Sequence, residues 1–157
     1  MNPVLRWVFR TPVKLYDHGW GRLLGHRFLC LTHVGRKSGR HYRTVLEVIG
    51  HDPAEDEVFV IAGLGPSADW YRNIRTAPAL EVIIGRRRFT PAHRRLDETE
   101  AVSVIAAYEH RNRLVTPILR VVLGKLLGRP YDGTPEARAA LAQALPVVAL
   151  RPIRPGC

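Results

Sequence analysis

Short apolar segments separated by turn-forming residues fill the chain from residue 28 to residue 96, and their order limits the fold more than any other feature. The aliphatic and β-branched residues in these segments are typical of strands. The predicted strands span residues 28–33, 44–49, 58–62, 80–84 and 87–91, with 92–96 continuing the sheet. One short helix is expected among them, at residues 69–75, and it ends near Pro78.

Helical patterns return only after residue 97. They predict helices at 98–110, at 115–127 and from Thr134 to residue 144, before a last strand at 147–151. A run of strands followed by helices, without regular alternation of the two, predicts an α+β fold with a largely antiparallel sheet or barrel. We expect a single domain over 1–157. Its parts are a basic amphipathic segment (1–27), the main barrel strands (28–96), and the helices with the final strand (97–157).

The chain is strongly basic. Its 24 Lys and Arg residues outnumber 14 acidic residues, which leaves a formal net charge of +10. Such an excess indicates a partner with several negative charges, such as a nucleic acid, an anionic membrane surface, or a ligand with several phosphates or carboxylates. The sequence carries no signature of the common nucleic-acid-binding folds, so we expect no nucleic-acid partner. Residues 3–16 mix apolar and basic side chains, and they fit either a helix packed on the domain or a membrane-surface helix.

Several kinds of site are excluded by the residue pattern. The seven histidines are scattered without an HExxH motif or a cysteine partner, so no metal site is predicted. The serines lie in no G-x-S-x-G motif, and no carboxylate pair stands out for acid–base chemistry. No catalytic side chain is therefore predicted, and an enzyme of this kind would rely on a cofactor.

The pattern also bears on location. The two cysteines form no CxxC motif, which favours a reducing cytosol. We expect no signal peptide, and no apolar stretch approaches the about 20 residues that a membrane span needs. A cytoplasmic protein is predicted, with contact between the N-terminal segment and the inner face of the membrane left open.

The segment GRKSGRHYR, residues 35–43, is the first candidate site. Two glycines accompany Arg36, Lys37, Arg40 and Arg43 between two predicted strands. Glycines let the backbone approach a ligand and present N–H groups, and arginine offers forked donors to phosphate or carboxylate. The segment predicts an anion-binding turn, with a solvated hairpin tip as the alternative. Its spacing is not that of a Walker A loop.

The loop GLGPSADWYRN, residues 63–73, is the second candidate. Gly63, Gly65 and Ala68 fit a G-x-G-x-x-A pattern, but Pro66 and the short helix that follows argue against a Rossmann dinucleotide site. A glycine loop before a helix can still bind an anion or admit a flat ring. Trp70 and Tyr71 either flank a planar cofactor or pack in the core.

Four segments carry a more specific signal together. They are LTHVGRKSGRHYRTVL (31–46), VFVIAGLG (58–65), ADWYRNIRTAPALEVIIG (68–85), and PYDGTP (130–135) with LAQALPVVALRP (141–152). In this order and spacing they resemble the deazaflavin-dependent nitroreductase family. The resemblance implies a split β-barrel that binds coenzyme F-420, an 8-hydroxy-5-deazaflavin with a phospholactyl-oligoglutamate tail.

The resemblance also implies a set of cofactor-binding residues. The phosphate and tail are expected at Arg36, Lys37, Ser38, Gly39, Arg43, Thr44 and Val45. The ring is expected at Ile61, Ala62, Gly63, Gly65, Ala68, Asp69 and Trp70.

The implied activity is hydride transfer from the reduced coenzyme to an apolar, electron-poor acceptor such as a quinone, an enone or a nitro compound. Three alternatives are an FMN-binding split barrel, a lipid-binding split barrel, and a basic nucleic-acid-binding module. FMN is the less favoured cofactor. A homodimer is left open.

Overall fold

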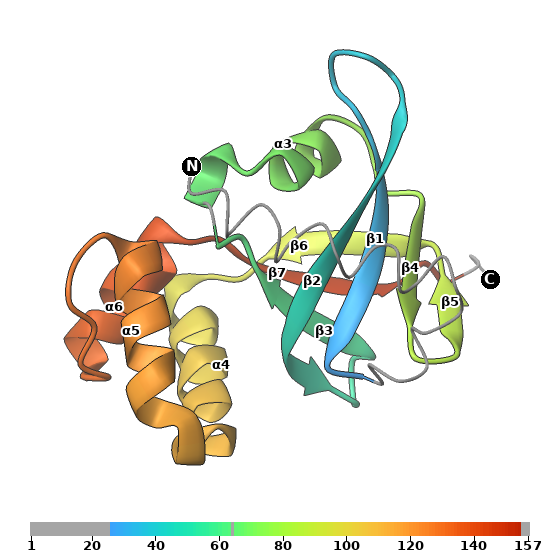
Figure 1. Ribbon diagram of the computed structural model, residues 1–157. Coiled ribbons are helices and arrows are strands. Elements are labelled where there is room, and N and C mark those ends of the chain that lie inside the picture. Colours follow the sequence, from blue (N-terminus) through green and yellow to red (C-terminus); the bar gives the residue numbers. More distant parts are fainter. Residues whose placement is uncertain (1–25, 64, 155–157) are drawn as a thin grey trace.

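The computed structural model describes residues 26–63 and 65–154, and its strands form one antiparallel sheet. The seven described strands are ordered β5-β4-β1-β2-β3-β7-β6. Their bounds are β1 (Phe28–Val34), β2 (His41–Asp52), β3 (Glu57–Ile61), β4 (Glu81–Ile84), β5 (Arg87–Phe89), β6 (Pro91–Arg95) and β7 (Val147–Pro152). The sheet curls into a nearly closed barrel (Figure 1), in which the edge strands β5 and β6 follow each other through Thr90. The prediction of an α+β split barrel is confirmed.

The helices lie outside the barrel in two places. They are η1 (Gly65–Ser67), α3 (Asp69–Thr76), α4 (Glu98–Arg111), η2 (Arg113–Val115), α5 (Thr116–Leu127) and α6 (Pro135–Ala144). Figure 1 shows α4, α5 and α6 gathered on one side of the barrel, whereas α3 lies across one end of it, near the turn that joins β1 to β2. None of the described helices is long and apolar enough to span a membrane.

Local signals explain where the helices begin and end. The Asp97 carboxylate accepts a hydrogen bond from the Glu100 amide at 2.8 Å and caps α4. The Thr134 hydroxyl accepts from the Ala137 amide at 3.2 Å and caps α6, as the sequence predicted. Helix α5 ends at Leu127, and the next residue, Gly128, has a φ of +79°, a left-handed conformation that glycine adopts without strain.

Strands β3 and β7 divide the core into two parts because alternate side chains point to opposite faces of the sheet. Val58 and Val60 pack inside the barrel with the β1 and β4 side chains Leu29, Leu31 and Val82, and with Trp70 and Ile74 of α3. The next residue in β3, Phe59, packs on the other face with the helices, together with Ile105, Leu123 and Leu141. The barrel and the helical cluster therefore share this pair of strands.

The strand ends differ from the sequence-based predictions most clearly at β2 and β5, and β2 also continues to Asp52, three residues past its predicted end at residue 49. Strand β2 begins at His41, earlier than the predicted residue 44, so Arg43 lies within a strand and the turn ends at Arg40. Strand β5 ends at Phe89, and Pro91 begins β6 instead. The reason is pairing: Pro91 lies opposite Pro152 of β7, a long-range partner that local sequence does not reveal.

Candidate functional site

The turn between β1 and β2 is closed by its own backbone. The Gly35 amide donates to the Arg40 carbonyl at 2.8 Å, and the Gly39 amide donates to the Gly35 carbonyl at 2.8 Å. Gly39 has a φ of +68°. At Gly35 a Cβ atom would lie 2.6 Å from Cε2 of Tyr42, so only glycine fits there without a shift of the ring. Both glycines are thus required by the shape of the turn.

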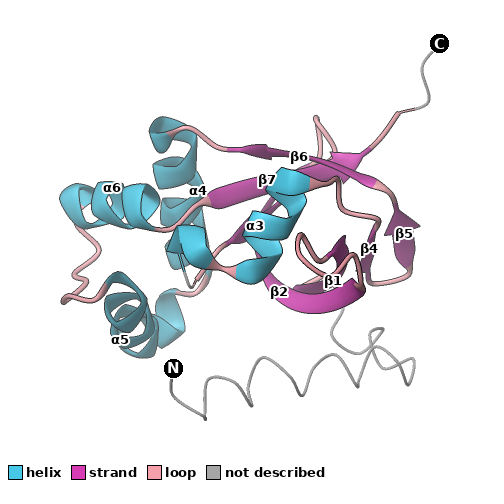
Figure 2. Cartoon of the chain, turned by 90° about the horizontal axis from the view of Figure 1, so that it is seen from above, coloured by secondary structure: helices cyan, strands magenta, loops and turns pink. Residues whose placement is uncertain are grey.

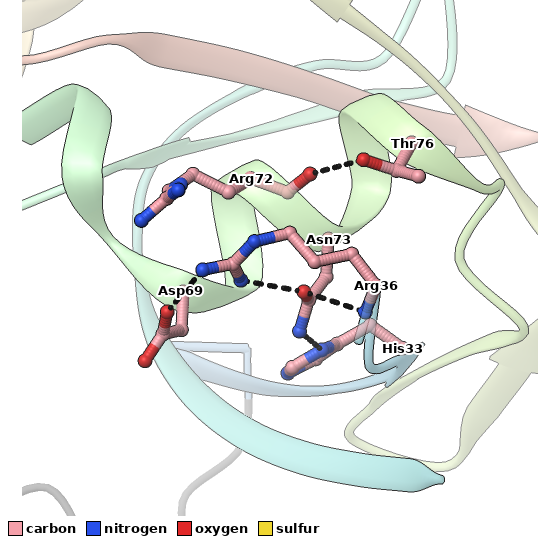
Figure 3. Close-up of polar contacts among 6 residues, drawn as sticks. All are labelled: His33, Arg36, Asp69, Arg72, Asn73 and Thr76. Atoms are coloured by element: carbon pink, nitrogen blue, oxygen red, sulfur yellow. Dashed lines mark hydrogen bonds and ion pairs between the residues drawn. The ribbon is translucent and has the colours of Figure 1, made fainter. Parts of the chain in front are cut away.

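Arg36 ties this turn to helix α3 (Figure 3). The backbone amide and the guanidinium of Arg36 both donate to Oδ1 of Asn73, at 3.1 and 2.9 Å. The same guanidinium also lies 3.1 Å from Oδ1 of Asp69, and the Arg36 side chain is 18% exposed. Asp69 and Asn73 are four residues apart and therefore lie on one face of α3. The turn and the helix are held as one unit.

A buried histidine completes this network. His33 and Asn73 are 3% and 4% exposed. Because Oδ1 of Asn73 accepts from Arg36, its amide nitrogen faces His33 and donates to Nδ1 at 3.0 Å. Nε2 of His33 then carries the hydrogen and donates to Oγ1 of Thr44 at 2.9 Å. Burial lowers the pKa of His33, against the smaller opposing effect of the Asp69 charge, so the ring is held neutral.

The register of β1 and β2 separates the predicted tail residues into two groups. Arg43 lies opposite Thr32, and Val45 lies opposite Cys30. Thr44, one residue away, lies opposite Leu31 and faces the barrel interior with His33. Neighbouring strand residues point to opposite faces. Arg43 and Val45 therefore lie on the outer face, where Val45 is buried against Cys30.

The predicted ring-binding residues form a bend between β3 and α3. The Ala62 amide donates to the Pro146 carbonyl at 2.9 Å, which anchors the bend to the start of β7. The Gly65 amide donates to the Ala62 carbonyl at 2.8 Å, and Gly65 has a φ of +77°. A Cβ added at Gly63 would meet only the Leu126 side chain, at 3.6 Å, which is an ordinary contact.

The ring-binding set includes side chains that belong to the core. Trp70 is 7% exposed, contacts Tyr71 edge-on, and packs with the barrel interior, as do Ala62 and Ala68. Ile61 packs instead against the helical cluster. Asp69 is exposed and paired with Arg36. The sequence left open whether Trp70 flanks a cofactor or packs in the core. In the structure its side chain packs in the core.

The structure thus brings Arg36, Asp69 and the turn residues Lys37, Ser38 and Gly39 together at one end of the barrel. It does not bring Arg43 and Val45 to the same face as Thr44. Two buried polar residues were absent from the predicted site, His33 and Asn73. The available signal was the four-residue spacing of Asp69 and Asn73, which places both polar side chains on one face of the short helix.

Exposed cations gather where the turn meets α3. Lys37 and Arg40 are exposed on the turn, and Arg72 is exposed on α3. Figure 3 shows the Arg72 side chain extending in the same direction as the Arg36 guanidinium. At Gly39 an added Cβ would meet nothing within 4 Å, so this part of the backbone is open to a ligand. Ammonium and guanidinium groups beside an open glycine can bind a ligand with phosphate or carboxylate groups.

Within the described part of the chain, no group of His, Cys, Asp and Glu side chains could hold a metal ion. All buried side-chain nitrogen and oxygen atoms described by the structure have hydrogen-bond partners. The buried polar groups of His33 and Asn73 therefore hydrogen-bond within the protein and hold the turn, whereas Lys37 and Arg40 remain exposed.

Comparison with known proteins identifies the family. No curated protein matches the chain. Among solved structures, an F420-H2 dependent reductase shares 17% identity with a TM-score of 0.45, over 82% of this chain and 96% of that chain. A domain-swapped dimer shares 15% identity with a TM-score of 0.51, over 90% of this chain and 100% of that chain. A protein of unknown function from Agrobacterium tumefaciens shares 17% identity with a TM-score of 0.50, over 87% of this chain and 54% of that chain.

At these identities, the last two structures show the fold alone. The family model described as F420H(2)-dependent quinone reductase matches residues 8–117, which is more than half of the chain. The chain therefore belongs to the F420H(2)-dependent quinone reductase family and is an oxidoreductase whose cofactor is coenzyme F-420.

Proposed function

We propose that this enzyme transfers a hydride from reduced coenzyme F-420 to an apolar, electron-poor acceptor such as a quinone, an enone or a nitro compound. Membership of the family supports the donor. The absence of a predicted catalytic side chain supports an acceptor that is activated by its own electron deficiency rather than by a protein acid. The bound coenzyme supplies the hydride, and the chain positions it and excludes water from it.

The tail of the coenzyme is proposed to lie on the turn. The observation that carries this assignment is the attachment of the turn to α3, which holds the exposed cations Lys37, Arg40 and Arg72 beside an open Gly39. A rigid set of cations binds a flexible polyanion with less loss of conformational freedom than a mobile one.

Arg36 takes a different role in this proposal from the one that the sequence suggested. Its guanidinium already donates to Asn73 and Asp69, so it acts as a positioning residue that holds Lys37 in place. Ser38 supports the same shape, because its hydroxyl accepts from the Arg40 amide at 3.2 Å.

The ring is proposed to lie along the Ala62–Ala68 bend. The side chains of Ala62 and Ala68 are small and buried, so the backbone of the bend, including Gly63 and Gly65, is the part that can approach a flat molecule. Trp70 and Ile74 support the bend from the barrel core rather than by touching the ring.

Titration with coenzyme F-420, followed by its fluorescence, tests the tail assignment. Lys37→Ala is expected to weaken binding by about tenfold, the loss of one charge-assisted hydrogen bond. Arg86→Ala is the matched control, because Arg86 is also an exposed cation on a hairpin turn, between β4 and β5. Equal effects of the two substitutions, or no binding by the unaltered enzyme, would contradict the proposal. Oxidation of the reduced coenzyme in the presence of each acceptor class identifies the acceptor.

We further propose that the enzyme forms a homodimer in the cytosol. The dimer is supported by a structural relative of matching length, which is a domain-swapped dimer. The location rests on the sequence, in which the two cysteines form no CxxC motif or disulfide framework. Light scattering of the purified chain measures the oligomeric state. The predicted membrane contact through residues 3–16 lies outside the described residues.

A further inference from the structure

Helix α5 and the short η2 before it present a row of apolar side chains to solvent. Leu114 is 92% exposed and Ile118 is 68% exposed. The other members of this row are Val115, Val121 and Val122, at 45%, 58% and 47%. Their spacing is that of one helical face. We call these five residues the α5 stripe.

The stripe exists because α5 is apolar on two opposite faces. On its inner face Leu119, Leu123, Leu126 and Leu127 pack against the helical core. The requirement for a core is met by these leucines, so the outer aliphatic residues are not needed for folding of the helical cluster. Figure 2 shows α5 at the edge of this cluster, on the side away from β6 and β7. A surface helix of a soluble domain ordinarily carries polar residues on that side.

The segment that carries the stripe is rich in cations, and the nearest acids in sequence are Glu109 and Asp132 at its two ends. From His110 to Tyr131 the sequence contains five cations and no Asp or Glu; the cations are Arg111, Arg113, Arg120, Lys125 and Arg129. Three of these cations, Arg120, Lys125 and Arg129, line an open depression of about 410 Å³ next to Val121. Apolar side chains thus border directly on a basic hollow.

We propose that the α5 stripe and this depression form a docking surface for an anionic lipid bilayer. The stripe would enter the boundary between headgroups and acyl chains, and the depression would receive a lipid phosphate. Aliphatic residues on one face of a helix with Lys and Arg beside them are the composition of helices that lie in the membrane interface. The inference is independent of the acceptor class and of the residues that hold the coenzyme.

The charge distribution decides between a membrane and a second copy of the chain. Two copies meeting through the stripe would bring two sets of these five cations together, in a protein whose net charge is already +10. Like charges at a shared interface are unfavourable, whereas an anionic surface is attracted by every one of them. The occupant favoured by charge is therefore the bilayer.

Vesicle sedimentation tests the proposal with the full-length chain. Binding is measured to phosphatidylcholine vesicles with and without phosphatidylglycerol, at low and high salt. The double substitution Ile118→Gln with Val121→Gln is expected to weaken binding to the anionic vesicles by about tenfold. The matched control is Leu80→Gln with Ile153→Gln, which changes two exposed aliphatic residues outside η2 and α5 and should leave binding unchanged. Arg120→Glu with Lys125→Glu should weaken binding and reduce its dependence on salt.

Three results would overturn the proposal. The first is no binding of the unaltered chain to anionic vesicles. The second is equal binding by the stripe variant and the Leu80/Ile153 control, with both variants melting at the temperature of the unaltered chain. The third is a change from dimer to monomer in the stripe variant, measured by light scattering, without any change in lipid binding, since that result assigns the stripe to a second copy.

Discussion

Asn73 accepts two hydrogen bonds from Arg36 on a single amide oxygen, one from the backbone amide at 3.1 Å and one from the guanidinium at 2.9 Å. One side chain on α3 thus holds both the main chain and the side chain of the first cation in the β1–β2 turn. The amide nitrogen of Asn73 is used as well, because it donates to His33. The shape of the turn depends on Asn73, a helix residue 37 positions after Arg36 in the chain.

Asn73→Ala is expected to destabilise the fold by about 1–3 kcal/mol, because it leaves buried polar atoms of His33 and Arg36 without a partner. Urea denaturation measures the change in the free energy of unfolding. Arg72→Ala is the control on the same helix, since Arg72 is exposed and its removal should change stability by less than about 0.5 kcal/mol. An equal decrease in the free energy of unfolding in both variants would show that the hydrogen bonds of Asn73 do not stabilise the fold more than an exposed side chain does.

Arg94→Met is expected to cost about 2–4 kcal/mol. The Arg94 guanidinium donates twice to the Glu57 carboxylate, at 2.9 Å each, and Glu57 is only 3% exposed. Removing the cation leaves a buried carboxylate without its charged partner. Arg88→Met is the comparison, because its pair with Glu81 is exposed and 3.6 Å long, and such pairs contribute about 0–1 kcal/mol. Unfolding free energies that change equally would contradict this prediction.

Stability is expected to fall as the pH drops below about 6.5, the pKa of histidine in an unfolded chain. Burial lowers the folded-state pKa of His33 and of His93. At a pH between the folded and the unfolded pKa values, the unfolded chain binds more protons than the folded chain. The stability that the neutral histidines contribute is therefore complete above the unfolded-state pKa and is lost as the pH falls toward the folded-state pKa. Urea midpoints measured at several pH values test this.

A pair of histidine variants separates the sources of that pH dependence. His93→Gln should reduce the slope of stability against pH, because one of the two rings with a lowered pKa no longer titrates. His33→Gln should reduce the slope as well, because burial lowers the pKa of that ring too. Stability that rises on acidification through this range would be incompatible with a neutral, buried His33.

Gly39→Ala is expected to destabilise the chain by about 1–2 kcal/mol through backbone strain alone. Gly39 has a φ of +68°, and an added Cβ would meet no atom within 4 Å. Gly39→Asn should cost less, because asparagine tolerates this conformation better than alanine. Gly63→Ala is the control, since its Cβ would make only an ordinary contact with Leu126. If urea denaturation gave Gly39→Ala the same free energy of unfolding as the unaltered chain, that result would contradict the described turn.

Local sequence was sufficient for most of the secondary structure. Residues 28–33, 58–62 and 80–84 were predicted as strands, and the structure has β1, β3 and β4 within one residue of those bounds. The helix after Thr134 was predicted with its cap. Apolar spacing, glycines, prolines and capping side chains act over a few residues, so they are readable along the chain.

The residues that form the candidate site were harder to predict from the sequence than the helices and strands. Arg36 was expected to bind the cofactor tail, yet its guanidinium lies on Asn73 and Asp69. Arg43 and Val45 were grouped with Thr44, but the β1–β2 register places them on the opposite face. Both outcomes depend on which strand residues pair and on where α3 is placed, and neither is a property of the segment itself.

By itself, the sequence determined the position of the strands and helices, the basic turn between glycines, and the family resemblance. The tertiary structure alone decided which cations remain at the surface, which polar groups are buried as a network, and which face of α5 meets solvent. The physical reason is the separation along the chain over which each kind of interaction acts. Backbone preference and side-chain periodicity act between near neighbours, whereas the Arg36–Asn73 contact and the two faces of β2 exist only after distant segments have paired.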